Sequence, residues 1–460
     1  MNGAVELIDQ QAAESQQTGS GLGDAQVKTI SSPGARLWRD SNFNIFWAGQ
    51  TLDALGSSSA LIIIPLLVLE ATGSILQMGL ITATIGLGSL LSSFASGVFV
   101  DRLDRRKIMI FSDIGRAVFY SLIPISWWLM GKSLWPIYLI TAIAAYLTTF
   151  FTVAYNTAIP NLVDQSQITD ANGRLQATAA LAFIAGPILA GFASRLDPAV
   201  SVGIVSLSYL ISALLMLLVR LRKTPVTSEC KGAIAESSRF KESLAGVRFL
   251  LRHPVLKPVT LLVSLFILAS GATLDLSIFR LKHDLRADDH IVGTVFGLAS
   301  IGAVLGGMFA PAMRRRWGFG FCFLTSMALT SVAIALIGLM PDVRGVAAMA
   351  IAFTFGTTVR TISSMSVRQQ VTPDHLLGRV SSAFLSLIII LGPIGTIAGT
   401  LVAQTAGTPF ALLMIGALGL VLTIIGLFTA ANTRRPEDVS AQAQVLEADC
   451  KPPVRRGQDE

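Results

Sequence analysis

Long apolar segments alternate with short polar connections along most of the chain. They predict about twelve helices, because a helix needs about 20 mostly apolar residues to cross the roughly 30 Å hydrocarbon core of a bilayer. The fourth and tenth segments contain Thr, Asn or Arg, but omitting either would place later connections on the wrong side. The predicted spans lie near residues 43–68, 75–100, 108–130, 134–156, 175–194, 200–220, 255–279, 291–312, 319–340, 345–366, 380–404 and 409–431.

The composition supports this interpretation. Of the 460 residues, 52% are hydrophobic and 14% are charged, whereas an average soluble domain has about 25% charged residues. Cys230, Cys322 and Cys450 fit no metal-binding spacing and cannot form a disulfide framework. We therefore expect an all-α integral membrane fold with twelve transmembrane helices in two pseudo-symmetric halves, and no metal or cofactor.

The positive charges predict the orientation of the chain. If the N-terminus is cytoplasmic, 28 of the 35 Lys and Arg residues fall on the cytoplasmic side and Arg116 lies inside a helix. The positive-inside rule then places both termini in the cytoplasm and the protein in the cell membrane. The same asymmetry explains the net charge of +7 without a nucleic-acid partner. Only six basic residues fall in outer connections: Lys132, Arg195, Arg280, Lys282, Arg286 and Arg344.

A polar stretch from Arg222 to His253 is the longest connection between predicted spans. It separates six spans from six others. The N-terminal residues are rich in Gln, Ser, Gly and Ala and lack the basic and apolar regions of a cleaved signal, so we expect a flexible tail. The predicted organisation is a cytoplasmic tail, a first half, a cytoplasmic loop, a second half and a second tail, over residues 1–36, 37–222, 223–254, 255–432 and 433–460.

Weak internal repeats support two related halves. A shift of 214 residues aligns Gly79 with Gly293 and Arg102 with Arg316. A second match aligns Gly186-Pro187 of the fifth span with Gly392-Pro393 of the eleventh. Parallel repeats of this kind predict a substrate path between the halves, near the middle of the membrane.

The connection after the second span contains the most specific string in the chain, Gly97-Val-Phe-Val-Asp101-Arg102-Leu-Asp104-Arg105-Arg106-Lys107. This string resembles the signature loop of the major facilitator superfamily, G-x-x-x-D-R-x-G-R-R, although Asp104 stands where that pattern usually has Gly. With the twelve spans, the resemblance covers about residues 37–432. It implies a cytoplasmic latch that stabilises the outward-facing state, formed by Gly97, Asp101, Arg102, Arg105 and Arg106. Alternatively, the charges only fix the orientation of the chain.

The fifth span contains Ala185-Gly186-Pro187-Ile-Leu-Ala190-Gly191. It looks like the antiporter motif of exporters in the same superfamily, G-P-x-x-G-G, with Ala190 in place of one Gly. Small residues permit close helix packing, and proline can bend a span. We therefore predict helix bending at Gly186, Pro187 and Gly191, and at Gly392 and Pro393 in the eleventh span; the alternative is generic helix packing.

Two acidic residues within the spans are candidates for proton coupling. Asp53 lies near mid-membrane in the first span, where a charged carboxylate is costly and a proton could be exchanged for a cationic or polar substrate. A packing acid bonded to Gln50 or Ser57 is the alternative. Asp275 lies near the outer end of the seventh span, before Arg280, and we expect it to be solvent-exposed.

Other polar and aromatic residues provide further candidates. Asp113 and Arg116 can share a helix face as an ion pair, either as a structural element or as part of the latch. Arg360 could bind an anionic substrate group or extend to the cytoplasmic surface. With Asp53 and Gln50, Arg360 and Phe150 are candidates for the substrate path. The aromatic residues that could stack on a planar substrate, or serve as core, are Trp47, Phe150, Phe151 and Phe266.

These features favour a secondary active transporter, in particular a proton-coupled exporter of hydrophobic or amphiphilic molecules. Several segments resemble the bacterial drug, macrolide and siderophore efflux subgroup: Trp47-Ala-Gly-Gln-Thr-Leu, Pro65-Leu-Leu-Val-Leu and Ala171-Asn-Gly-Arg174.

A siderophore exporter and a proton-coupled nutrient importer are alternatives. A lipid-handling or sensory protein also remains open, whereas a membrane enzyme would need a nucleophile, metal site or acid–base cluster that the sequence does not offer. No Walker string occurs, so the expected energy source is an ion gradient, most naturally of protons. The resemblance implies a monomer.

Overall fold

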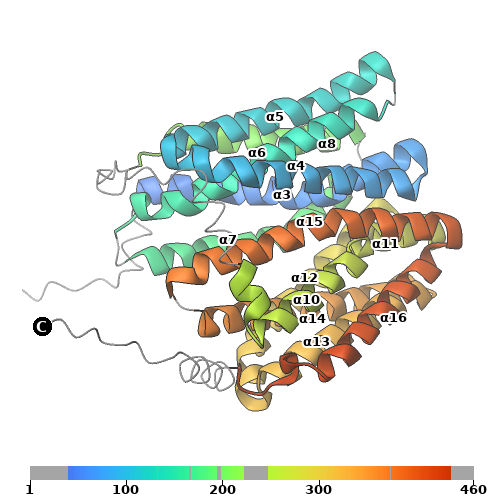
Figure 1. The fold of residues 1–460 in the computed structure, drawn as a ribbon. Helices are drawn as coiled ribbons and strands as arrows, with labels where there is room; N and C mark the ends of the chain where they lie inside the picture. Colours follow the sequence, from blue (N-terminus) through green and yellow to red (C-terminus); the bar gives the residue numbers. More distant parts are fainter. Residues whose placement is uncertain are drawn as a thin grey trace, which may run out of the picture.

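The computed structural model describes residues 40–131, 133–164, 167–193, 198–221, 247–372 and 374–436, which are mainly helical and contain no strand. Figure 1 shows the helices running roughly side by side. The first group comprises α3 (Ser41–Thr72), α4 (Ile75–Arg102), α5 (Arg105–Met130), α6 (Trp135–Leu162), α7 (Ile168–Ala193) and α8 (Pro198–Met216). The second group comprises α10 (Leu256–Ser270), α11 (Thr273–Phe279), the π-helix η3 (Arg280–Asp284), α12 (Asp289–Trp317), α13 (Phe319–Leu339), α14 (Val343–Val371), α15 (Asp374–Ala406), α16 (Thr408–Leu427) and the 3-10 helix η4 (Ala430–Asn432).

The helices lie where the apolar pattern predicts spans. Among the described residues, 11 helical stretches are long and apolar enough to cross a membrane, and Val200–Met216 of α8 is a shorter apolar helix. The expected all-α membrane fold is therefore confirmed. The division at residues 223–254 stays a prediction, because most of that segment lies outside the described residues.

Some predicted boundaries were wrong. Helix α7 begins at Ile168 instead of 175, because polar residues at the edge of a span can be helical without being apolar. The seventh span is broken into α10 and α11 near Gly271 and continues as η3 to Asp284. Gly271 lies against the Gly392 carbonyl of α15, with space for no side chain between them. Close helix packing therefore accompanies this break.

Local chemistry explains where the first long helix begins and ends. The Asp40 carboxylate accepts hydrogen bonds from the backbone N–H groups of Asn42 and Phe43, at 2.9 and 3.3 Å, and so caps α3. The helix ends at Gly73, whose φ of 63° lies in the left-handed region that glycine adopts without strain. These two signals delimit a helix of 32 residues, long enough to cross a bilayer obliquely.

The bundle has two ends. At the proximal end, where α3 begins and α8 has ended, Asn42 exchanges two hydrogen bonds with the backbone of Arg220, at 2.8 and 2.7 Å. At the distal end, where α3 ends, Lys282 of η3 lies 3.5 Å from Glu70 and also pairs with Asp289 at the start of α12. The Glu70–Lys282 pair connects the two groups of helices.

The two groups pack closely toward the distal end. The Gly191 backbone of α7 meets Gly293 of α12, and Gly79 of α4 meets Thr400 of α15. The hydroxyl of Ser300 on α12 also donates to the Phe183 carbonyl of α7, at 3.2 Å. Figure 1 shows α15 running along the first group, beside α4. Small residues thus allow the facing helices to approach each other closely.

Candidate functional site

Three charged side chains meet in the core of the first group of helices. Asp53 lies on α3, whereas Asp113 and Arg116 lie three residues apart on α5. The Arg116 Nη2 donates hydrogen bonds to Oδ1 of Asp113 and, at 2.5 Å, to Oδ1 of Asp53. Arg116 and Asp113 are fully buried, and the Asp53 side chain is 13% exposed. This Arg116 network joins α3 and α5 through one buried guanidinium.

Two further helices hold the network in place. Ser212 of α8 donates a 2.7 Å hydrogen bond to Oδ2 of Asp113. The Arg116 guanidinium lies 4.5 Å from the ring centre of Phe151 on α6 and 4.2 Å from that of Tyr209 on α8, so aromatic faces add cation–π attraction. Tyr209 and Ser212 were not among the predicted site residues, although two polar residues three positions apart in an apolar helix were the available signal.

The expected intrahelical pair of Asp113 and Arg116 is confirmed. The alternative partners of Asp53 were wrong: the described hydrogen bond of Asp53 comes from Arg116, whereas Ser57 bonds to the hydroxyl of Tyr209 at 3.1 Å. Asp53 also faces a cavity of about 180 Å³, so it is the network's carboxylate that can meet a ligand or a proton. The cavity is lined by Gln50, Asp53, Ala54, Phe151, Thr152, Tyr155, Leu175, Thr178 and Ala179.

A second cavity, of about 230 Å³, lies between the two groups of helices. We call it the interface cavity. Apolar side chains dominate its wall, and a few hydroxyls interrupt them, as in a pocket for an amphiphilic molecule. It is lined by Ser58, Leu61 and Ile62 of α3, Phe183 and Pro187 of α7, Thr273, Leu274 and Ser277 of α11, Phe296, Ala299 and Ser300 of α12, Ile337 of α13, and Ala350, Phe353 and Thr354 of α14.

Both predicted helix-bending motifs lie where helices pack closely. The Gly186 carbonyl accepts a 3.0 Å hydrogen bond from Ser59 of α3, and Pro187 lines the interface cavity. Pro393 of α15 lies against Gly86 of α4 in the other group. Gly191 likewise contacts the opposite group. The Gly392 carbonyl lies against Gly271 within its own group, although a Cβ at Gly392 itself would meet nothing within 4 Å. Whether these residues bend the helices during transport stays a prediction.

Asp275 lies in a different environment from the one expected. Its side chain is fully buried, not solvent-exposed, because α11 packs against α4 of the first group. Thr82 of α4 donates a 3.0 Å hydrogen bond to Oδ1 of Asp275, and Oδ2 has no partner. Asp275 is therefore a buried acid at the contact between the two groups of helices.

Comparison with known proteins identifies the chain's family. Residues 46–393 match the family model described as Major Facilitator Superfamily. The chain belongs to the major facilitator superfamily. It is similar to the multidrug efflux pump Tap of Mycolicibacterium fortuitum, with 25% identity over 84% of this chain and 94% of Tap. Macrolide efflux protein A of Streptococcus pyogenes is 25% identical over 83% of this chain and 94% of its own length. The enterobactin exporter EntS of Escherichia coli O1:K1 is 24% identical over 82% and 90%.

Solved structures support the same fold. The nucleoside transporter NupG superposes with a TM-score of 0.70 at 12% identity, over 84% of this chain and 98% of its own. A bacterial homologue of the lysosomal transporter Spinster, in an inward-facing and unoccupied conformation, superposes with a TM-score of 0.66 at 13% identity, over 91% and 99%. The protein is thus a multi-pass membrane protein with a major facilitator fold.

In this superfamily member, part of the predicted latch holds helix ends together. Arg105 donates to the Thr157 carbonyl of α6 at 2.7 Å, and Arg106 donates to carbonyls at the end of α8. Asp104, which departs from the family pattern, caps α5 by accepting a 2.9 Å bond from the Arg106 N–H. The side chains of Gly97, Asp101 and Arg102 lie outside the described residues, so their latch role stays a prediction.

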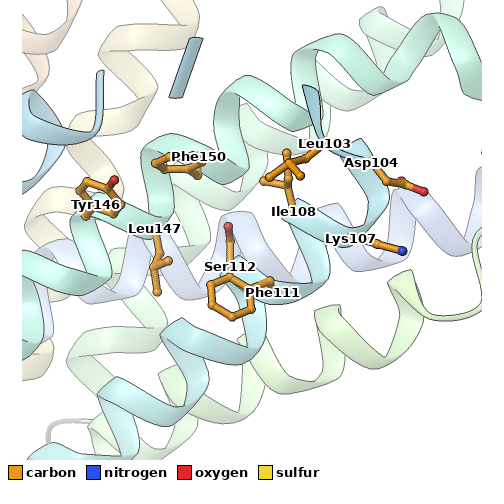
Figure 2. Close-up of a pocket in the computed structure, with 9 residues that line it drawn as sticks. All are labelled: Leu103, Asp104, Lys107, Ile108, Phe111, Ser112, Tyr146, Leu147 and Phe150. Atoms are coloured by element: carbon orange, nitrogen blue, oxygen red, sulfur yellow. The ribbon is translucent and has the colours of Figure 1, made fainter. Parts of the chain in front are cut away.

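Phe150 lies away from the cavity that Asp53 faces. Figure 2 shows it on α6 beside Ile108, in a groove of about 360 Å³ between α5 and α6. Phe111 of the same groove is 70% exposed, so the groove opens at the periphery of the bundle. The adjacent Phe151 instead faces Arg116 and lines the Asp53 cavity. Adjacent helical residues point in directions about 100° apart, which explains the difference.

Arg360 is buried in the second group of helices and is only 7% exposed. Its guanidinium lies 4.2 Å from the ring centre of Phe266 on α10. Arg368, two turns further along α14, is 9% exposed and lies 3.5 Å from the ring centre of Phe384 on α15. Arg368 was not among the predicted site residues, and its spacing of eight residues from Arg360 was the available signal.

The Gly191–Gly293 contact provides a stability prediction. A Cβ at Gly293 would lie 2.3 Å from the Pro187 carbonyl oxygen and 2.8 Å from the Gly191 Cα, so Gly293→Ala must force the helices apart. We expect it to lower the free energy of unfolding by about 1–3 kcal/mol. The matched control is Gly307→Ala on the same helix, where a Cβ meets nothing within 4 Å. The thermal midpoint of the purified protein is the measurement, and equal midpoints for the two variants would contradict the prediction.

Proposed function

We propose that this protein is a proton-coupled exporter of hydrophobic or amphiphilic small molecules, working by alternating access in the cell membrane. The Arg116 network is the observation that carries this proposal, because it places an acid at a cavity within the membrane-spanning part of the chain. In this proposal the protein acts as a monomer, and both termini are cytoplasmic because basic residues concentrate on that side.

Charge balance in the network supports proton coupling. When ionised, Asp53 and Asp113 share the single positive charge of Arg116, which leaves one negative charge in surplus. Such a surplus is costly away from water. A proton on Asp53 removes it, and so does a cationic or strongly polar substrate group in the adjoining cavity. Because the two compete for one carboxylate, binding of the substrate promotes release of the proton.

The packing between the two groups supports alternating access. The Glu70–Lys282 pair, the Thr82–Asp275 bond and the Gly191–Gly293 contact hold the groups together toward the distal end. If the termini are cytoplasmic, these contacts close the extracellular side, as in an inward-facing state. Outward opening must break them and expose the buried Asp275 carboxylate, which is therefore the second candidate for proton coupling.

The named activities of relatives support export as the direction. Two of the similar proteins are named efflux pumps or efflux proteins, and a third is named an enterobactin exporter. Because the third relative is named an enterobactin exporter, export of a siderophore is the alternative function. The apolar wall of the interface cavity favours a substrate with a large hydrophobic part over a small hydrophilic nutrient.

The test is efflux from a pump-deficient bacterial host that expresses the protein. Cells are loaded with a panel of fluorescent dyes and antibiotics, and efflux is followed with and without a protonophore. Efflux that the protonophore abolishes supports the proposal. Equal retention of every panel member in expressing and non-expressing cells, combined with proton-driven uptake of a nutrient in the same cells, would instead establish an importer.

A further inference from the structure

One face of α14 carries a column of buried polar groups that lack hydrogen-bond partners. Thr357, Arg360, Ser364 and Arg368 follow one another at spacings of three or four residues, so they lie along one side of the helix. Each has at least one buried side-chain nitrogen or hydroxyl oxygen without a hydrogen bond. In the described part of the chain, no carboxylate lies within 4.0 Å of either guanidinium. We call these four residues the α14 column.

The first group of helices shows what a buried arginine requires. Arg116 stacks on aromatic rings, as Arg360 and Arg368 do, but it also pairs with two carboxylates of its own chain. Aromatic stacking uses the face of the guanidinium and leaves the N–H groups at its edge free to bind an anion. A buried cation without a counter-charge is costly. Arg360 and Arg368 lack the paired carboxylates that Arg116 has.

The column continues the wall of the interface cavity. Ala350, Phe353 and Thr354 of α14 line that cavity, and Thr357 follows Thr354 by less than one turn on the same side of the helix. Arg360 lies about 9 Å further along the axis from Thr354, at 1.5 Å per residue. An apolar cavity followed by two cations matches a molecule with a hydrophobic body and an acidic group.

We propose that the α14 column is a binding site for the anionic group of an amphiphilic substrate, a carboxylate, sulfonate or phosphate. Arg360 is the main ligand, because a guanidinium can bind such a group through two parallel N–H bonds. The Thr357 and Ser364 hydroxyls donate further hydrogen bonds, and Arg368 forms a second cationic position toward the proximal end. The hydrophobic body occupies the interface cavity.

This inference rests on the proposed function and narrows its substrate class. A substrate that also carries an amine offers a cation for Asp53 as well as an anion for Arg360. Such a molecule would still compete with a proton at Asp53. The predicted substrates are therefore amphiphiles with an acidic group, and above all those with both an acidic and a basic group.

Binding to the purified full-length protein in lipid nanodiscs tests the proposal without transport. The probes are naphthylacetate, naphthalene sulfonate and naphthyl phosphate, each compared with the neutral naphthylacetamide, and empty nanodiscs correct for partition into lipid. We expect at least one anion to bind about tenfold or more tightly than the amide. Arg360→Gln should remove that preference, and Arg360→Lys should retain part of it, because lysine keeps the charge but loses the fork geometry.

Two controls make the result decisive. Arg315→Gln removes an exposed arginine of α12 and should leave the preference unchanged. Binding of the neutral amide by Arg360→Gln shows that the variant is folded. Nanodiscs with and without phosphatidylglycerol distinguish the source of the anion. If this lipid suppresses binding of the anionic probes to the wild type but not to Arg360→Gln, the natural ligand of the column is a lipid headgroup. If the lipid does not suppress probe binding, the ligand is a soluble amphiphile.

Wild-type protein that binds no anion more tightly than the amide would overturn the proposal. So would a preference that Arg360→Gln keeps in full. Failure of the efflux assay alone would leave this binding result intact, since nanodisc binding needs neither a gradient nor a direction of transport. The proposed function and the anion site can therefore fail separately.

Discussion

Arg116→Gln is expected to lower the free energy of unfolding by about 3–5 kcal/mol, the usual effect of removing one partner from a buried ion pair. The substitution leaves Asp53 and Asp113 close together without their shared cation. It also removes the cation that lies against the rings of Phe151 and Tyr209. The measurement is the fraction of purified protein that stays monodisperse after heating, compared with the wild type.

A second variant separates the charge effect from loss of packing. Asp53→Asn and Asp113→Asn added to Arg116→Gln remove all three charges, so the triple variant should recover part of the lost stability. Arg344→Gln is the surface control, because Arg344 is exposed at the distal end of α14. If Arg116→Gln were as stable as Arg344→Gln, the network would not have the structural role assigned to it.

Asp53→Asn is expected to reduce protonophore-sensitive efflux at least tenfold while the protein still folds. Folding is retained because Arg116 keeps its pair with Asp113, and Asn can still accept a hydrogen bond from the guanidinium. Coupling is lost because an amide cannot take up and release a proton. The measurement is efflux of an identified substrate over a range of external pH, normalised to the amount of protein in the membrane.

The control for this variant is Asp104→Asn. Asp104 is an exposed acid that caps α5, and asparagine caps helices about as well as aspartate. This control should keep wild-type efflux. Full gradient-driven efflux by Asp53→Asn at every pH would exclude Asp53 as the coupling residue and leave Asp275 as the remaining candidate among the predicted acids.

The fold was largely predictable because the bilayer imposes a length and a composition on each span. The apolar segments near residues 319–340 and 409–431 correspond closely to α13 and α16. The break near Gly271 was not predictable in the same way, since an apolar run continues across it. Packing against Gly392, more than 100 positions away in the sequence, is a tertiary effect that hydropathy does not record.

The site was predictable in its residue types but not in its contacts. Asp53, Asp113 and Arg360 are noticeable in the sequence because charge is rare within spans. Their partners depend on which helix face each residue occupies, and spans that are apolar on all sides give little periodic signal. This is why the pairing of Asp53 with Arg116, 63 positions away, and the burial of Asp275 emerged only from the structure.

The unpaired arginines on α14 have an electrical consequence. If one proton enters for each substrate that leaves, export of a singly charged cation moves no net charge, export of a zwitterion moves one, and export of an anion moves two. Each charge that crosses a potential of 100 mV contributes about 2.3 kcal/mol. A pump whose substrate binds Arg360 through an acidic group would therefore draw on the membrane voltage, and would keep working when the pH gradient alone has collapsed.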